Sequence, residues 1–282
     1  MRRIFISILI LAAAMAVLSS CGGEQVHNVE ERAFAMDTQV IVDVWYMDTA
    51  RNRNEAHYRQ LALDAIEIAH EMELIFSRHI EGTDVWRINN APYGEYVQVH
   101  DYVIQVLEYA QYFRELTGGR FDVTIGAVLE LWDFGFHSEG IIPHQLDINR
   151  TLATVGTDII INGNMVRLAH PDAIIDLGAI AKGFASDRMA DFLLENDAAG
   201  FANFAGDIAM SKPRPDGEPW RLGIIIPFQD VLSTAIFGHV EMFEGGFVTS
   251  GIDQRMFTVN GQLFHHILDV DTGFPVYTPM AT

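Results

Sequence analysis

The stretch IIDLGAIAKGFASD, residues 174–187, contains the change of pattern that decides the fold. Ile174 and Ile175 have the apolar character of the end of a buried strand, and Gly178 permits a tight turn immediately afterwards. Beyond the turn, apolar residues follow the spacing of one buried helix face: Ile180, Phe184 and Phe192. The stretch therefore predicts a strand, a turn and a helix that runs from about residue 179 to 195.

Lys182 stands in the first turn of this predicted helix, and the chain has only one other lysine, Lys212. A cation there opposes the positive end of the helix dipole, at a cost of roughly 0.3–1 kcal/mol. The free N–H groups of a first helical turn favour anions, so an anionic ligand would offset the charge of Lys182. Asp176, just before the turn, can accept hydrogen bonds from a ligand or contribute to a metal site. The simpler interpretation, a solvated lysine on an ordinary strand–turn–helix unit, stays open.

The first half of the chain combines one strand pattern with two helix patterns. Period-two alternation between Ala33 and Tyr46 predicts a half-buried strand. Apolar residues spaced by three and four from Asn54 to Phe76 predict an amphipathic helix. A second helix is expected from about Asp101 to Leu116, ended by Thr117-Gly118-Gly119. The next segment, 121–135, leaves strand and helix equally open.

The second half is richer in strand patterns. Hairpins are predicted with turns at Asn162-Gly163 and at Asn260-Gly261, and a strand is expected to end at Asp176. Further strands are expected within 201–210, 221–227 and 241–251. Strands and helices mixed with hairpins favour an α+β fold, with mixed or antiparallel sheets flanked by helices, over a purely parallel sheet. We expect one domain over residues 33–282.

The N-terminal region has the pattern of an exported lipoprotein. A short basic start precedes an apolar run about as long as a secretory h-region, and LSSC, residues 18–21, follows it. The run is short for a spanning helix, and the single cysteine of the chain, Cys21, lies where a lipobox needs it. We therefore predict a signal peptide over residues 1–20, lipidation of Cys21 and a polar tether over residues 21–32. An ordinary signal peptide and a membrane anchor are the alternatives.

The charge balance limits the possible partners. The chain carries 38 acidic residues against 18 lysines and arginines. Loss of residues 1–20 would remove two arginines and no acid, leaving 16 basic residues and a net charge of −22. Such a surface disfavours nucleic acid and anionic lipid as partners. With Cys21 lipidated, no thiol remains for disulfides or cysteine catalysis.

Two more segments carry residues suited to chemistry. GGRFDVTIG, residues 118–126, combines two glycines with the aromatic face of Phe121 and the carboxylate of Asp122, although a helix end followed by a core strand also explains it. HHILDVDTGFP, residues 265–275, holds histidines and aspartates suited to metal or acid–base chemistry, in a spacing that matches no standard zinc motif. Adjacent histidines on a strand face opposite sides, so at most one of them should point into a site.

Six segments in this order resemble the FAD:protein FMN transferases, the ApbE or thiamine-biosynthesis lipoprotein family. The resemblance runs through nearly the whole mature chain. The segments are AMDTQVIV (35–42), FSRHIEGTDVWRINNA (76–91), GGRFDVTIGAVLELWDFG (118–135), IDLGAIAKGFASD (175–187), NFAGDI (203–208), and VTSGIDQR (248–255) with FHHILDVDTGFP (264–275).

The resemblance implies a T-fold-like domain, an activity and a set of site residues. Members of the family bind FAD and Mg²⁺, break the FAD pyrophosphate, attach FMN through its phosphate to a Thr or Ser of a partner protein, and release AMP. Some relatives instead hydrolyse FAD to FMN and AMP. Ala179 would offer a backbone carbonyl to the metal. The residues that the resemblance assigns to FAD are Met36, His79 (where many members have Tyr), Arg120, Phe121, Asp122, Asp176, Lys182, His266 and Ile267.

Lys182 and His266 are the implied catalytic residues. A lysine, a helix N-terminus and Mg²⁺ would stabilise the charge that develops on the phosphates. His266 is the candidate that accepts the proton of the acceptor hydroxyl, a role typically worth ~10²–10⁴-fold in rate; positioning phosphate is its alternative role. The expected acceptor is an electron-transport protein outside the cytoplasmic membrane. The competing functions are a lipoprotein that binds FAD without chemistry and a FAD pyrophosphatase.

The sequence departs from the family pattern at its C-terminal end. The family continues past the TGxP block with a strand and a helix whose Asp and Thr supply most of the metal's side-chain ligands, whereas this chain stops at Thr282. We therefore expect either a truncated record of a longer protein or a product without competent Mg²⁺ binding, with an exposed sheet edge. Smaller departures are Asp37, Ala205 and Val270, where the family usually has Gly, Gly and Pro.

Overall fold

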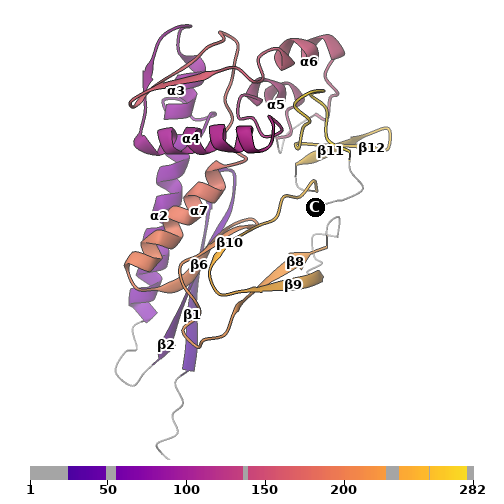
Figure 1. Ribbon diagram of the computed structural model, residues 1–282. Helices are drawn as coiled ribbons and strands as arrows, with labels where there is room; N and C mark the ends of the chain where they lie inside the picture. The colour runs from indigo at the N-terminus through magenta and orange to yellow at the C-terminus, as the bar shows by residue number, and fades with distance from the viewer. Residues whose placement is uncertain (1–24, 49–54, 136–138, 227–234, 254, 278–282) are drawn as a thin grey trace, which may run out of the picture.

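A computed structural model describes residues 25–48, 55–135, 139–226, 235–253 and 255–277. Figure 1 shows two long helices, α2 and α7, against one sheet, with the shorter helices α3, α5 and α6 and helix α4 gathered at one end of them. The elements in chain order are β1 (Gln25–Ala35), β2 (Thr38–Asp48), α2 (Glu55–Phe76), α3 (Asp84–Asn90), β3 (Val97–Gln98), α4 (Asp101–Leu116), α5 (Gly126–Trp132), α6 (Gln145–Leu152), β4 (Ile159–Asn162), β5 (Met165–Leu168), α7 (Ala181–Glu195), β6 (Ala199–Phe204), β7 (Asp207–Met210), β8 (Trp220–Ile225), β9 (Ile236–Met242), β10 (Gly245–Val248), β11 (Met256–Val259) and β12 (Gln262–His265).

The main sheet has five strands in the order β1-β2-β6-β7-β10, and every neighbouring pair is antiparallel. Three smaller sheets join β3, β5 and β4, then β8 and β9, then β11 and β12. The predicted α+β fold with antiparallel sheets flanked by helices is therefore confirmed. The helices predicted over 54–76, 101–116 and 179–195 correspond to α2, α4 and α7.

The polar tether predicted over residues 21–32 is wrong from residue 25 onward. Residues 25–35 form β1, which pairs with β2 along its whole length, from Gln25 opposite Asp48 to Ala35 opposite Thr38. The strand lies at the edge of the sheet and leaves many of its side chains exposed, so its sequence reads as polar. Met36 and Asp37 form the turn with φ of 53° and 60°, the left-handed conformation that suits a tight hairpin.

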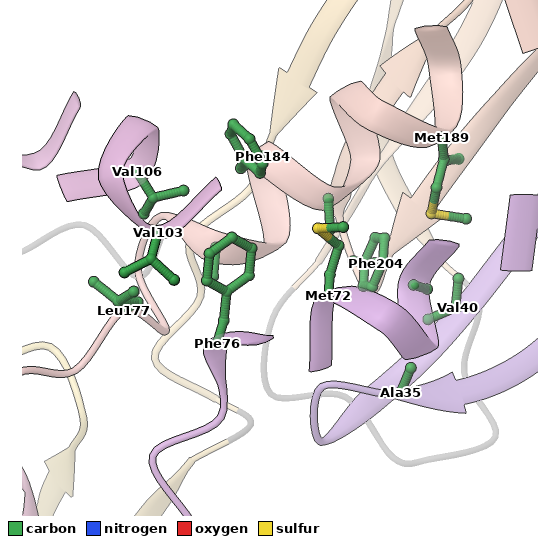
Figure 2. Close-up of a cluster of buried hydrophobic side chains, with 14 of the residues drawn as sticks. Ala35, Val40, Met72, Phe76, Val103, Val106, Leu177, Phe184, Met189 and Phe204 are labelled. Carbon is green, nitrogen blue, oxygen red and sulfur yellow. The ribbon is translucent and has the colours of Figure 1, made fainter. Parts of the chain in front are cut away.

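The core lies between the main sheet and the helices α2, α7 and α4 (Figure 2). Phe76, at the end of α2, meets Phe184 of α7 edge to face, with ring centroids 5.7 Å apart. Phe204 of β6 is fully buried beneath these helices. The apolar spacing recognised in α2 and α7 thus faces one common core, which holds the N-terminal end of α7 in place.

A second apolar cluster, around Trp132, fastens the β11–β12 hairpin to α5. The Trp132 ring contacts Phe264 and Phe274, and its indole N–H donates to the Gly273 carbonyl at 2.7 Å. Phe264 is part of β12, immediately before the two adjacent histidines. The position of residues 265–275 is therefore set by an aromatic core of its own.

The strand predicted to end at Asp176 needs correction. Residues 173–176 form no strand: Ile174 makes a single parallel bridge to Ile125, and the Asp176 N–H donates to the Val123 carbonyl at 2.8 Å. The chain comes so close here that a Cβ on Gly126 would lie 2.5 Å from the Ile174 carbonyl oxygen, and Gly126 then begins α5. The ambiguous segment 121–135 therefore begins as a turn, in which the Ile125 N–H donates to the Asp122 carbonyl, and continues as α5, which ends at Trp132.

The two predicted hairpins are present, with a small shift in one. Asn260 and Gly261 form the turn between β11 and β12 as predicted, both with positive φ. The turn between β4 and β5 is Gly163-Asn164, one residue later than predicted, because Asn162 pairs with Met165. Among the described residues, no helix has the length and apolar character needed to cross a bilayer. The predicted signal peptide and Cys21 lie outside these residues.

Candidate functional site

Lys182 makes an ion pair within the protein. It lies in the first turn of α7, where the N-cap residue Ile180 provides no side-chain hydrogen bond to the helix. The ammonium nitrogen of Lys182 lies 2.6 Å from Oδ2 of Asp207, the first residue of β7. The two side chains are 31% and 12% exposed. Lys182 is therefore not the solvated surface lysine of the simpler interpretation, since a nearly buried carboxylate balances its charge at the unfavourable end of the helix.

His266 follows β12 and faces the same region. Its backbone N–H donates to the Arg255 carbonyl at 3.2 Å, and its ring Nδ1 lies 3.3 Å from the same oxygen. Because a carbonyl only accepts, this contact places a proton on Nδ1 and leaves the Nε2 lone pair as the acceptor. Burial lowers the pKa of His266 below its ordinary 6.5; the hydrogen bond to Arg255 opposes this, and the charges of Arg255, His265 and Lys182 lower it further. His266 is thus a neutral base within electrostatic reach of Lys182.

The preceding residue, His265, has a different environment. Its ring is buried, its Nε2 lies 3.0 Å from the Val276 carbonyl, and its Nδ1 accepts the Ile267 N–H at 3.3 Å. Burial lowers the pKa of His265. The two histidines therefore contact different neighbours: His265 ends β12, and His266 lies just beyond it. His265 holds the loop, and Ile267 contributes its backbone to that contact.

The turn that contains Met36 is attached from two directions. The Met36 N–H donates to the Glu73 carboxylate at 3.0 Å. Asp37, the next residue, receives an Nη2 donor of Arg255 at 2.6 Å across 218 residues of sequence. Since the Arg255 carbonyl also holds His266, one arginine connects the β1–β2 turn to the candidate base.

Asp176 and His79 lie around a second arginine, Arg78, which is only 11% exposed at its side chain. Arg78 reaches the carboxylates of Asp176 and Glu130, each at 2.6 Å. The other oxygen of Asp176 accepts the Gly178 N–H at 2.8 Å and so fixes the turn before α7. Burial and the Arg78 charge lower the pKa of His79, against the opposing charges of Asp176, Glu130 and Asp37.

The loop 118–126 reaches the histidine segment through Arg120. This exposed side chain lies 2.7 Å from Asp271 and 3.6 Å from Asp269. Asp122 is buried, and its carboxylate oxygens bond to Thr124 and to Arg114. Phe121 packs edge to face on Phe113 of α4. The structure thus brings two of the sequence-predicted segments together, with Asp122 as the internal anchor of the first.

We call the following residues the charged cluster: Asp37, Arg78, His79, Glu130, Asp176, Lys182, Asp207, Arg255 and His266. Its arginines and its lysine each contact a carboxylate of the cluster. These contacts come from six separate parts of the chain, which is the arrangement expected for a site built to hold a polar ligand.

Comparison with known proteins now decides the family. The sequence model of the ApbE family matches residues 36–282. The chain belongs to the ApbE family. It is 30% identical over 225 residues to the FAD:protein FMN transferase of Klebsiella pneumoniae (strain 342), covering 78% of this chain and 68% of that protein. It is 26% identical over 287 residues to the FAD:protein FMN transferase of Treponema pallidum (strain Nichols), covering 95% and 77%.

Solved structures agree with this ApbE assignment. The ApbE protein from Thermotoga maritima superposes with a TM-score of 0.76 at 31% identity, covering 88% of this chain and 78% of that one. The flavin transferase ApbE from Vibrio cholerae superposes with a TM-score of 0.72 at 25% identity, covering 90% and 79%. The T-fold-like architecture implied by the sequence resemblance is that of this family.

The metal site implied for an ApbE protein is not supported by the described residues. Ala179 is an exposed residue in the turn before α7. Within the described ranges, no group of three or more His, Cys, Asp or Glu side chains could hold a metal ion. A hard cation such as Mg²⁺ needs near-octahedral oxygen ligands, and one carbonyl does not supply them. Cys21, the predicted lipidation site, lies outside the described residues.

A pocket of about 700 Å³ lies behind the loop 118–124. Its lining comes from α4, from this loop and from residues 157–160, and includes Arg114, Gly119 and Asp122. The pocket is open to solvent, and no residue of the charged cluster lines it. We therefore place the candidate active site at the charged cluster, where the base, the lysine and the helix N-terminus lie.

Four members of the charged cluster were not singled out from the sequence: Arg78, Glu130, Asp207 and Arg255. Two of their contacts join residues 98 and 218 positions apart. Asp207 stood inside the NFAGDI segment and Arg78 inside FSRHIEG, so their segments were recognised. Their roles depend on which strand and which helix end meet in space, and no local pattern encodes that.

Proposed function

We propose that this ApbE protein transfers FMN from FAD to a Thr or Ser hydroxyl of a partner protein and releases AMP. The observation that carries the proposal is the juxtaposition at the start of α7. There, a charge-balanced lysine stands at a helix N-terminus without a side-chain cap, within electrostatic reach of a neutral histidine. The relatives named FAD:protein FMN transferase support the same activity.

Lys182 and the N-terminus of α7 supply the positive charge that would bind the phosphates. An ammonium has three donors, so contact with Asp207 leaves Lys182 two for phosphate oxygens. The first-turn N–H groups of α7 face the same anion. As the bond between the FMN phosphorus and the bridging oxygen breaks, negative charge grows on the departing AMP, and this fixed positive environment stabilises it. AMP leaves with the bridging oxygen.

His266 supplies the base. Its Nε2 lone pair is free to accept the proton from the acceptor hydroxyl while that oxygen attacks the FMN phosphorus. The acceptor Thr or Ser is thereby joined to FMN through a phosphate ester. The proposed flavin side of the site consists of Met36, His79, Arg120 and Phe121, and the buried Asp122 anchors the loop that carries the last two. Asp176 and Ile267 support the loops beside the phosphates.

Mg²⁺ would supply charge neutralisation for the phosphates in such a reaction. Because the described residues offer the Ala179 carbonyl without a set of acidic side chains, we route no step of the mechanism through the metal. The requirement is tested by measuring transfer against added Mg²⁺ and with EDTA. Transfer that survives EDTA would remove magnesium from the proposal.

We further propose that the protein is exported and anchored by lipid at Cys21, with an electron-transport protein as its acceptor. The sequence pattern of residues 1–21 supports the anchor. Since β1 begins at Gln25, four residues later, the open end of the β1–β2 hairpin would then lie close to the membrane. Labelled palmitate should enter the wild-type protein and not Cys21→Ser; equal labelling would contradict the anchor.

One incubation distinguishes the candidate activities. The protein is mixed with FAD, Mg²⁺ and a flavin-acceptor domain, and the products are separated by gel and by chromatography. A fluorescent acceptor band with equimolar AMP is the result we expect. Free FMN and AMP without labelled acceptor would mean a FAD pyrophosphatase. Intact, bound FAD would mean a binding protein.

A further inference from the structure

We propose that Asp207 is a positioning residue for FMN transfer, acting through Lys182 and specifically on the pyrophosphate part of FAD. The inference rests on the proposed function and assigns a role to a residue to which the sequence gave none. Asp207 contacts the lysine at 2.6 Å, and its own side chain is 12% exposed.

The backbone around Asp207 is held in place by contacts that do not involve Lys182. Asp207 follows the β6–β7 turn, in which Ala205 and Gly206 have φ of 49° and 111°. The Gly206 N–H donates to the Asn203 side chain at 2.8 Å, and the Gly206 carbonyl accepts the Thr249 N–H at 3.1 Å. Three strands of the main sheet thus determine where the carboxylate stands, and the carboxylate in turn determines where the ammonium stands.

The Asp207 carboxylate balances the unfavourable position of the Lys182 ammonium in the unliganded protein. Lys182 lies where the helix dipole disfavours a cation, and the charges of Lys182 and Arg255 both act on His266. Without a carboxylate partner, the ammonium would gain most by turning toward bulk water. Asp207 removes this tendency, so that the remaining two donors stay available to the phosphates of FAD. Asp207 should therefore affect the binding of the phosphates of a ligand and not the binding of the flavin ring.

This division of labour predicts a ligand-specific result. Asp207→Asn keeps the shape of the side chain and removes its charge. We expect it to weaken FAD binding about tenfold, the loss of one charge-assisted contact. Binding of riboflavin, which has no phosphate, should change less than about twofold. Both affinities are measured by flavin fluorescence. Equal weakening of FAD and riboflavin would overturn the proposal, because it would indicate general damage to the site.

A double-mutant cycle tests whether Asp207 acts through the lysine. In a Lys182→Met background, Asp207→Asn should change FAD affinity less than about twofold, because the residue through which it acts is gone. The same tenfold loss in both backgrounds would contradict the proposal. Asp197→Asn, which removes a carboxylate from the other lysine of the chain, is the matched control and should leave both ligands unaffected.

Two further measurements keep the outcome interpretable. Asp207→Glu retains the charge but displaces the carboxylate by one methylene, so it should fold and still lose FAD affinity; wild-type affinity would argue against positioning. Transfer to the acceptor is measured separately from binding. If wild type binds FAD and the cycle holds but no acceptor is labelled, the proposed function fails and the pairing role stands. If the acceptor is labelled and the cycle fails, only the role of Asp207 is lost.

Discussion

Helix α7 has a lysine–aspartate pair at each end, and the two pairs have different explanations. At the C-terminal end, Lys212 donates both to the Asp197 carboxylate and to the Asp197 carbonyl, just beyond the last residue of the helix. At the N-terminal end, Lys182 pairs with Asp207 in a nearly buried contact. A cation is favoured at the C-terminus of a helix and disfavoured at its N-terminus.

The comparison teaches where to look for function in this chain. Helix stability alone accounts for Lys212, whose partner Asp197 is 99% exposed and has its pKa lowered by the hydrogen bond and charge of the lysine. Helix stability argues against Lys182. A residue that local physics disfavours and that a second residue is placed to hold is expected at a functional site. Of the chain's two lysines, we therefore assign the catalytic role to Lys182.

The largest expected effect lies at His266, the proposed base. His266→Ala should lower FMN transfer by ~10²–10⁴-fold, because it removes the proposed base. His239→Ala, an exposed histidine of β9, is the control and should transfer flavin like wild type. Transfer is followed as fluorescence of the acceptor. Unchanged transfer by His266→Ala would rule out the base assignment, and a loss below tenfold would leave His266 only the role of positioning phosphate.

The lysines themselves come next. Lys182→Met should lower transfer by about 10²–10³-fold, the typical loss when a preorganised charge that faces the transition state is removed. Lys212→Met should change it less than about twofold. Single-turnover rates at saturating FAD make the comparison. Similar losses in both variants would break the distinction between the two ends of α7.

The stability of the protein should depend on pH because His265 and His266 are neutral in the folded state. Burial lowers the pKa of His265 and His266 below 6.5, so both are neutral in the folded protein at pH 7.5. As pH falls below 6.5, the unfolded chain takes up protons first, and this contribution to the free energy of unfolding is lost. The melting temperature should therefore fall between pH 7.5 and 5.5, and by less in His265→Gln. An identical fall in both proteins would contradict this.

The smallest expected effect lies at the surface pair. Asp197→Asn should shift the melting temperature by less than about 2 °C, since solvent screens an exposed ion pair. Differential scanning calorimetry in low salt gives the most sensitive comparison. A larger shift would mean that the C-terminal end of α7 depends on its lysine pair more than its exposure allows.

Much of the fold could be predicted from local patterns. The bounds of α2 and α4 and the Asn260-Gly261 turn follow from apolar spacing, helix ends and turn chemistry. Most of β1, residues 25–32, was missed because an edge strand with exposed side chains has no apolar signal to distinguish it from a tether. The strand expected before Asp176 is only a single bridge between Ile174 and Ile125. Gly126, which begins α5, lies directly against the Ile174 carbonyl.

Some residues of the site could be predicted from the sequence and others could not, for a physical reason. Lys182 and His266 could be proposed because the unusual helix position and the paired histidines are visible in the sequence, and the family resemblance joined them. Asp207 and Arg255 could not be assigned roles, because their contacts depend on how the β6–β7 turn and the β11–β12 hairpin are placed in the folded protein. Packing between distant elements, rather than any motif, assembles these partners.

The central claim, that this protein moves FMN from FAD to a hydroxyl of another protein, is tested most directly by the intact mass of the acceptor. An acceptor domain is incubated with FAD and either wild-type protein or Lys182→Met, and the mass of the domain and the AMP released are measured together. We predict that wild type adds one FMN to each acceptor with one AMP released, and that Lys182→Met does so at least a hundredfold more slowly. An acceptor of unchanged mass while AMP accumulates would contradict the account.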